Sequence, residues 1–168
     1  MALQGSGSRK TGRVGGERFK TEDAMSTTTR DENRAVAEEF FQRINDHDLG
    51  VIDELCADDF AVEIARKGTE ESVVGRDGLR AIYEEYFAAF PDWQSRLDEV
   101  LVDGDRVAVF STETGTHDGE FRGVSPTGNE IEVEGAGMVR VREGKIVDLR
   151  PHPNMLGLFE QIGVDLDL

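Results

Sequence analysis

The stretch that decides the fold runs from Glu113 to Asp148 and begins with Glu-Thr-Gly-Thr-His-Asp-Gly-Glu-Phe. It continues through the turn-forming Ser-Pro-Thr-Gly-Asn and ends with Val-Arg-Glu-Gly-Lys-Ile-Val-Asp. Apolar residues alternating between these turns predict strand, turn, strand, hairpin and strand. His117 falls where the first strand ends and a glycine-containing turn begins, which makes it the first candidate for a functional side chain.

The longest strand of this stretch is marked by apolar residues at alternate positions, Ile131, Val133, Val139 and Val141. Gly135 and Gly137 interrupt it, and glycine inside a strand often marks a bulge or bend. Upstream, Asp103-Gly104-Asp105 predicts a tight hairpin between strands over 97–102 and 106–116. A further strand is predicted around Phe60 to Ile64.

Helical spacing accounts for most of the remaining chain. An amphipathic helix is predicted from Asp31, a short one at 51–56, a clear one from Arg76 to the stop at Pro91, and a last one at 155–162. Helices followed by a run of strands predict an α+β fold. We expect a curved antiparallel sheet forming a cone, with the N-terminal helices packed over it and a central pocket.

Composition narrows the function classes. The net charge of -16 would repel nucleic acid and anionic membranes, so neither is an expected partner. Cys56 is the only cysteine, which excludes an intrachain disulfide and fits a reducing cytoplasm. No apolar run approaches the roughly 20 residues of a membrane span. We interpret the acidity as a surface adapted to high salt, and expect a cytoplasmic protein.

The first residues differ from the rest of the chain. Residues 1–30 are predicted to form a disordered, basic, glycine-rich tail, because they contain few apolar side chains to bury. Met25 is a possible alternative translation start. Residues 31–168 are then expected to form one domain.

Several short motifs together resemble one family. They are Gly115-Thr-His-Asp-Gly-Glu-Phe121, Pro126-Thr-Gly128, Gly144-Lys-Ile-Val147 and Leu156-Gly-Leu-Phe-Glu-Gln-Ile-Gly163. In this order and spacing they are similar to the SnoaL-like polyketide (ester) cyclases of the nuclear-transport-factor-two-like superfamily. The resemblance spans about Asn33 to Gly163 and implies the α+β cone already predicted from the pattern.

The resemblance also implies a chemistry. Such cyclases perform an intramolecular aldol condensation without a cofactor or a metal: a base removes a proton alpha to a carbonyl, and the enolate attacks a second carbonyl. This requires a pocket that aligns a folded substrate, one acid/base group and donors for the enolate oxygen. The expected ligand is a small hydrophobic carbonyl compound.

The family's acid/base aspartate aligns with Asn154, whose amide cannot transfer a proton near neutral pH. His117, which matches a family histidine, and His152 are therefore the catalytic candidates, with Asn154 orienting a carbonyl or capping the last helix. His117 could instead be tied into the sheet edge, and His152, between two prolines, could lie in a surface turn. The expected substrate contacts are Phe40, Tyr86, Trp93, Phe121 and Met138.

Three strand carboxylates, Glu113, Glu132 and Glu134, could also enter the cone, where burial would raise the pKa of a carboxyl. Strand phase alone does not assign their faces. Two alternatives to an enzyme stay open: a binding protein that lost its acid at Asn154, and a structural homodimer formed through the open sheet face. A homodimer is the expected assembly.

Overall fold

The computed structural model describes residues 17–63 and 73–165. In chain order the elements are α1 (Glu17–Asn45), α2 (Gly50–Leu55), β1 (Cys56–Glu63), β2 (Val73–Val74), α3 (Arg76–Ala89), β3 (Gln94–Asp103), β4 (Arg106–Thr116), β5 (Glu130–Arg142), β6 (Lys145–Pro153) and α4 (Met155–Gln161). The predicted α+β class is confirmed. None of the described helices is long and apolar enough to cross a membrane.

One six-stranded sheet organises the molecule, in the order β2-β1-β6-β5-β4-β3. The strands β3 to β6 form the predicted antiparallel run, but β1 pairs parallel to β6, so the sheet is mixed. The expectation of a purely antiparallel sheet followed strand order along the chain. It missed that the first long strand lies beside the last one.

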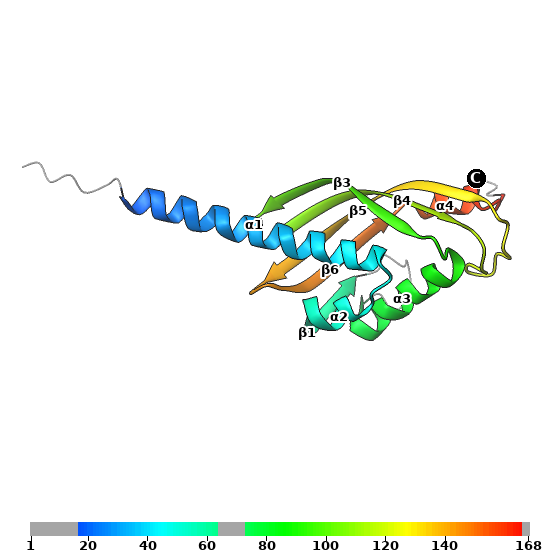
Figure 1. Ribbon diagram of the computed structural model, residues 1–168, viewed down its shortest axis with the longest axis horizontal. Coiled ribbons are helices and arrows are strands. Elements are labelled where there is room, and N and C mark those ends of the chain that lie inside the picture. Colours follow the sequence, from blue (N-terminus) through cyan, green and yellow to red (C-terminus); the bar gives the residue numbers. More distant parts are fainter. Residues whose placement is uncertain (1–16, 64–72, 166–168) are drawn as a thin grey trace, which may run out of the picture.

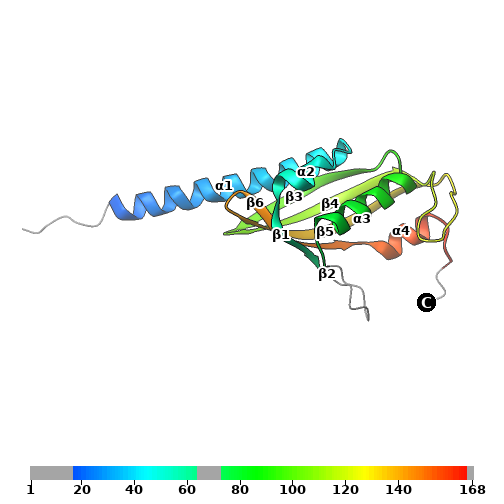
Figure 2. The ribbon, with the colours of Figure 1, turned by 90° about the horizontal axis from the view of Figure 1, so that it is seen from below.

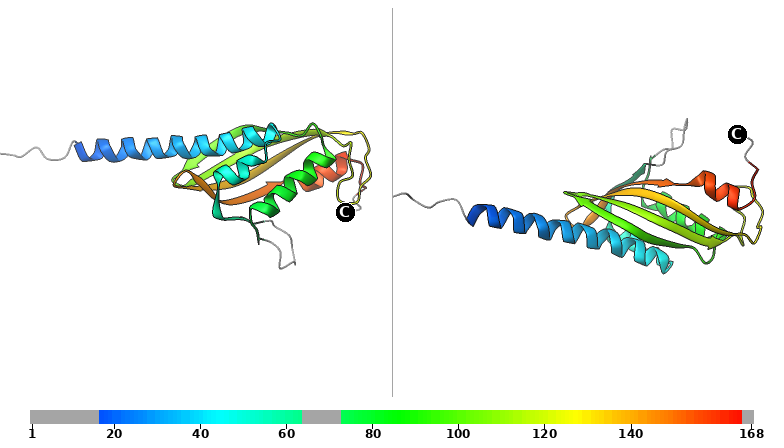
Figure 3. Two further views of the ribbon diagram at one scale, coloured as in Figure 1. Left: turned by 60° about the horizontal axis from the view of Figure 1, so that its bottom comes forward. Right: turned by 90° about the horizontal axis from the view of Figure 1, so that it is seen from above.

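Helices cover one face of the strongly curved sheet. Figure 1 shows α1 running along the sheet, with its N-terminal part extending beyond the strands, and Figure 2 shows α2 and α3 on the same side. The two views of Figure 3 show the molecule from two sides, with α4 at one end of the sheet. Leu158 of α4 packs in one cluster with Tyr86 of α3, so α4 covers the end of the same face. This arrangement is an open cone with a helical cover.

Two apolar clusters fill the space under the helices. The first joins α1 and α2 to the sheet through buried residues such as Phe40, Ile44 and Ile52. The second lies at the other end, where Phe90, Trp93 and Leu158 bring α3 and α4 together. Each cluster removes apolar surface from water, and the space between them remains available for a ligand.

Three local expectations needed correction. Helix α1 begins at Glu17 rather than near Asp31, so the part of the predicted tail from 17 is helical, while residues 1–16 lie outside the described part. Strand β6 continues through His152 to Pro153, beyond the stretch ending at Asp148 that predicted it. The β4–β5 ladder is unbroken at Gly135 and Gly137, so these glycines make no bulge in it.

Candidate functional site

A cavity of about 730 Å³ lies between α3 and the inner face of the sheet, where the two apolar clusters meet. Its wall is mainly apolar and aromatic, and a small number of polar side chains reach it from the sheet and from α3. A largely apolar cavity with a few convergent polar groups is the usual form of a small-molecule site.

Glu113 is the strand carboxylate in this wall. Val109 and Ser111 are buried at alternate positions of β4, and the same phase turns Glu113 toward the helices. The Ser111 hydroxyl donates to Glu113 Oε1 at 2.6 Å, and the Ser95 hydroxyl lies 3.5 Å from the same oxygen. One carboxyl oxygen is thus held by two serines on neighbouring strands.

The other oxygen of Glu113 lacks this support. Oε2 is buried and has no hydrogen-bond partner among the described residues. Burial raises the pKa of Glu113 above its ordinary 4.5, and the bonds from Ser111 and Ser95 oppose the shift without cancelling it. A carboxyl with a raised pKa is better suited to exchange a proton near neutral pH.

Gly135 makes room for this carboxyl. A Cβ atom at Gly135 would lie 2.8 Å from Glu113 Oε2 and 3.1 Å from Oε1, closer than carbon and oxygen normally approach. The glycine that the sequence pattern assigned to a bulge therefore serves the site. Glu132 and Glu134, the other strand carboxylates, are exposed.

Two phenols from α3 line the same cavity. Burial is the main cause that raises the pKa of both Tyr83 and Tyr86, so both hydroxyls stay protonated at neutral pH. The Tyr86 hydroxyl donates to the thioether of Met155 at 3.4 Å, a weak acceptor. A ligand carbonyl or enolate oxygen would be a stronger acceptor for either phenol.

His152 and Asn154 line the cavity, but both are exposed and so lie at its rim. The Asn154 side chain accepts from the Gly157 N–H at 2.9 Å and is the N-cap of α4. The capping role that the sequence allowed is therefore present, and it leaves the amide nitrogen for other contacts. His152 belongs to strand β6 rather than to a surface turn.

His117 does not line the cavity. Its side chain is fully buried, and its ring is tilted against that of Phe90, with 5.3 Å between the ring centroids. Nδ1 contacts Thr127 Oγ1 at 3.0 Å. Its backbone N–H donates to Asn129 O, and its carbonyl accepts from Gly128. His117 thus joins the two turn motifs of the β4–β5 connection, an arrangement that supports a structural role instead of the expected one.

The five expected substrate contacts divide in two. Tyr86 and Trp93 line the cavity, with ring centroids 4.7 Å apart. Phe40, Phe121 and Met138 do not. Phe40 and Phe121 are buried in the two apolar clusters, and Met138 follows Gly137, the last residue of β5 that lines the cavity.

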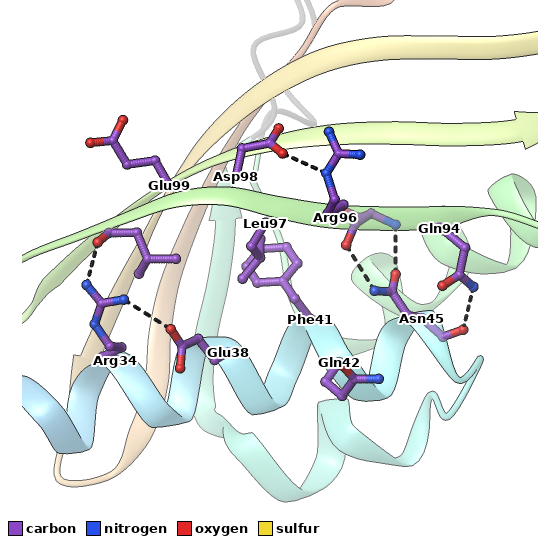
Figure 4. A pocket seen from close by; sticks show the side chains of 12 residues that line it. Arg34, Glu38, Phe41, Gln42, Asn45, Gln94, Arg96, Leu97, Asp98 and Glu99 are labelled. Atoms are coloured by element: carbon purple, nitrogen blue, oxygen red, sulfur yellow. Dashed lines mark hydrogen bonds and ion pairs between the residues drawn. The ribbon is translucent and has the colours of Figure 1, made fainter.

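A second cavity, of about 540 Å³, lies between α1 and β3 (Figure 4). Its polar groups bind one another: Asn45 pairs with the backbone N–H and C=O of Ser95, and Arg34 reaches Val100 O and Glu38. These contacts pair the backbone N–H and C=O of Ser95 and the C=O of Val100 on the free edge of β3. We interpret this groove as the seam that fixes α1 to the sheet.

Metal-binding residues do not cluster in the part of the chain that the structure describes: it holds no group of three or more His, Cys, Asp or Glu placed to hold an ion. The central cavity instead brings together one buried carboxyl, hydroxyl donors and an arginine, Arg122. These groups can transfer a proton and stabilise a developing negative charge.

The family follows from the chain as a whole. The model of the SnoaL-like polyketide cyclases matches residues 26–162, which cover the whole sheet and all the described helices except the first residues of α1. The chain belongs to the SnoaL-like polyketide cyclase family. The sequence resemblance and the cone fold that it implied are thereby confirmed. No curated protein matches the chain.

Solved structures share this SnoaL-like fold. AclR, a candidate hydroxylase from Streptomyces galilaeus, is 29% identical with a TM-score of 0.73, over 83% of this chain and 85% of its own. IdmH, a candidate polyketide cyclase from Streptomyces antibioticus, is 28% identical with a TM-score of 0.71, over 79% and 99%. TsrD from Streptomyces laurentii, 22% identical over 80% and 96% with a TM-score of 0.69, shows the fold alone.

Sequence reasoning named Glu113 but did not select it, and it missed Arg122, Ser95 and Ser111. The strand around Glu113 gave an ambiguous phase, because Phe110 is apolar yet faces outward, 46% exposed. The signal that could have assigned Glu113 to the inner face is the odd-numbered series of β4. Its members, which share one face, are Val107, Val109, Ser111 and Glu113.

Proposed function

We propose that this chain catalyses cofactor-independent proton transfer alpha to a carbonyl, leading to intramolecular aldol cyclisation of a small hydrophobic compound. The observation that carries the proposal is Glu113, a carboxyl with a raised pKa and one unpartnered buried oxygen, beside a largely apolar cavity. Membership of the cyclase family supports the reaction class.

In this mechanism Glu113 acts as the base. Its carboxylate removes a proton from the carbon alpha to a carbonyl, and Ser111 keeps the carboxyl in one orientation. The enolate oxygen accepts a hydrogen bond from Tyr83 or Tyr86. The enolate carbon then attacks a second carbonyl of the same molecule, and the protonated Glu113 returns the proton to the new alkoxide.

The cavity contributes by holding the substrate folded. Aromatic side chains such as Trp93 offer flat surfaces that restrict how a planar compound can lie. Alignment of two reacting groups before the chemical step lowers the entropic part of the barrier. Water exclusion from the apolar wall protects the enolate from reprotonation by solvent.

The test is deuterium exchange of a simple ketone. We would incubate 2-tetralone with the protein in D₂O and follow loss of its alpha proton signal by NMR. The wild type should accelerate exchange over buffer, and Glu113→Gln should reduce the acceleration by about 100-fold or more. Glu134→Gln, which neutralises an exposed carboxylate of β5, should exchange like the wild type.

Asn154 favours one alternative, a binding protein that has lost its acid. An aspartate at 154 can still accept the Gly157 N–H, so Asn154→Asp should fold normally. If the wild type binds the ketone without exchanging it and Asn154→Asp gains exchange, the chain is a binding protein on this scaffold. If the Glu113→Gln variant exchanges the alpha proton of the ketone as fast as the wild type, the proposed role of Glu113 is wrong.

A further inference from the structure

Arg122 sits in a turn that suits its backbone poorly. Phe121 and Val124 exchange two backbone hydrogen bonds, of 3.0 and 2.9 Å, and between them Arg122 has φ +48° and Gly123 φ +85°. Two consecutive positive φ angles define a type I′ turn, whose first central position normally holds Asn, Asp or Gly. An arginine at this position has a strained backbone, and such strain is concentrated at functional sites.

The turn places the guanidinium of Arg122 at the wall of the central cavity. The guanidinium carbon lies 4.9 Å from the centroid of the Phe121 ring and 6.0 Å from that of Tyr86. These rings confine the cation to one region through cation–π contacts. The side chain keeps 29% of its surface exposed, so a ligand can reach it.

The donors of this guanidinium are only partly used. Nε and Nη2 face the Glu85 carboxylate at 3.2 to 3.4 Å, longer than the usual charge-assisted bond. Within the described residues, Nη1 contacts only the thioether of Met155, at 4.0 Å. Arginine offers five N–H donors, and a thioether is a weak acceptor. A better acceptor inside the cavity would therefore gain hydrogen bonds.

The described wall of the cavity is poor in positive charge. Arg122 is the only lysine or arginine among the described residues that line it, in a protein with net charge -16. The remaining wall offers an anion no other cation. A planar guanidinium matches a carboxylate in two-point geometry, and desolvation by aromatic rings strengthens the interaction.

We propose that Arg122 anchors a carboxylate of the ligand, so that the substrate is a carbonyl compound bearing a free acid rather than an ester. This inference rests on the proposed function only in taking the central cavity as the ligand site. Glu85 pairs with Arg122, and the ligand carboxylate accepts hydrogen bonds from the exposed donors of the guanidinium. The apolar body of the ligand then lies toward Trp93 and Glu113.

Binding can be measured without turnover, because Trp93 is the only tryptophan of the chain and lines the cavity. The probes are anthraquinone-2-carboxylate and its methyl ester, which absorb where tryptophan emits and quench it. The wild type should bind the acid about 10-fold to 100-fold more tightly than the ester, the range expected for hydrogen bonds to a charged group. This preference should shrink as NaCl is added.

Two variants test the residue itself. Arg122→Asn suits the positive φ and keeps the turn, and it should remove the preference for the acid while the ester binds within about threefold of wild type. Glu85→Gln keeps the arginine and removes its competing carboxylate, so the acid should bind at least as tightly as to the wild type.

Equal affinity of the wild type for acid and ester, or a preference that survives Arg122→Asn, would overturn the proposal. Weaker binding of the acid to Glu85→Gln would also contradict it. The binding assay and the exchange assay fail independently. If the protein prefers the acid but exchanges no ketone protons, Arg122 is the anchor and the proposed reaction is wrong. If it exchanges ketone protons but does not prefer the acid, the proposed reaction holds and the anchor is wrong.

Discussion

At the scale of single residues, Glu113 is the side chain whose proposed chemical role lowers the stability of the folded state. Its carboxyl lies against apolar surface, where the charged form is disfavoured, and only Oε1 receives hydrogen bonds. Gly135 has no side chain, and this leaves the space that the carboxyl occupies. A carboxyl kept in such surroundings costs stability at neutral pH, which is the usual mark of a functional group rather than a structural one.

This cost predicts a pH dependence. Because burial raises the pKa of Glu113 above 4.5 in the folded state, its contribution to stability is fully present below the unfolded pKa and is lost as the pH rises through the folded pKa. Glu113→Gln stays neutral at every pH. Its melting temperature should be close to that of the wild type near pH 4 and exceed it increasingly toward pH 8.

Thermal unfolding followed by circular dichroism between these pH values checks the sign. Glu134→Gln is the matched control, because its carboxyl is exposed and should give no such trend. A wild type that gains stability relative to Glu113→Gln as the pH rises would show that the folded protein favours the carboxylate, against the arrangement described here.

At the scale of elements, the connection from β4 to β5 holds one end of the cone in place. The backbone N–H groups of Asp118 and Gly119 both donate to Ala89 O at the end of α3. A Cβ atom at Gly119 would lie only 1.9 Å from Ala88 O, so this close approach requires glycine. The motifs that identify the family thus dock a loop onto a helix.

Thr127 tests whether this connection is structural. Its hydroxyl lies 3.0 Å from His117 Nδ1 and also accepts from the Asn129 N–H at 3.3 Å. Thr127→Val keeps the shape and removes both bonds, so the free energy of unfolding should fall by about 1–3 kcal/mol. Ketone exchange per folded molecule should stay within about twofold of wild type.

Urea denaturation and the NMR exchange assay on the same preparation measure both quantities. Thr112→Val is a control in β4, remote from the connection. It removes a threonine hydroxyl that bonds Asp98 and Arg96, so it should lower stability without involving His117. A tenfold fall in exchange with unchanged stability would return His117 to the catalytic role that the sequence first suggested.

At the scale of the whole molecule, the main electrostatic feature is the excess of acidic residues. Acidic residues outnumber basic ones by 35 to 19, and the ion pairs between described side chains are largely at the surface, where each contributes little. We therefore expect the self-repulsion of the folded chain to outweigh the attraction of its ion pairs. The cytoplasmic location, the salt-adapted surface and the homodimer remain predictions.

Self-repulsion predicts that salt stabilises the protein. Raising NaCl from 0.01 to 0.3 M shortens the screening length from about 30 Å to less than 10 Å. The melting temperature should then rise by several degrees, and an equal osmolality of sucrose separates screening from surface exclusion. A melting temperature that is flat or falls over this range would mean that the ion pairs outweigh the repulsion.

The sequence by itself determined most of the elements and the family. Local rules set both: apolar periodicity marked α3 and the strands β3 to β5, and Asp103-Gly104-Asp105 marked their first hairpin. Turn motifs with fixed spacing carried the family resemblance, because their residues can be recognised in the chain without knowing which segments they contact.

Only the tertiary structure decided the site. Glu113 lies opposite Ser95 in a pair of strands, and Gly135 of β5 leaves room for its carboxyl. Arg122 reaches the cavity from a turn that is distant from α3 in the sequence but contacts Glu85 of that helix. Strand alternation offers two faces, and nothing local says which one the helices will cover. The burial that raises the pKa of Glu113, and that removes His117 from the cavity, comes from packing between distant segments.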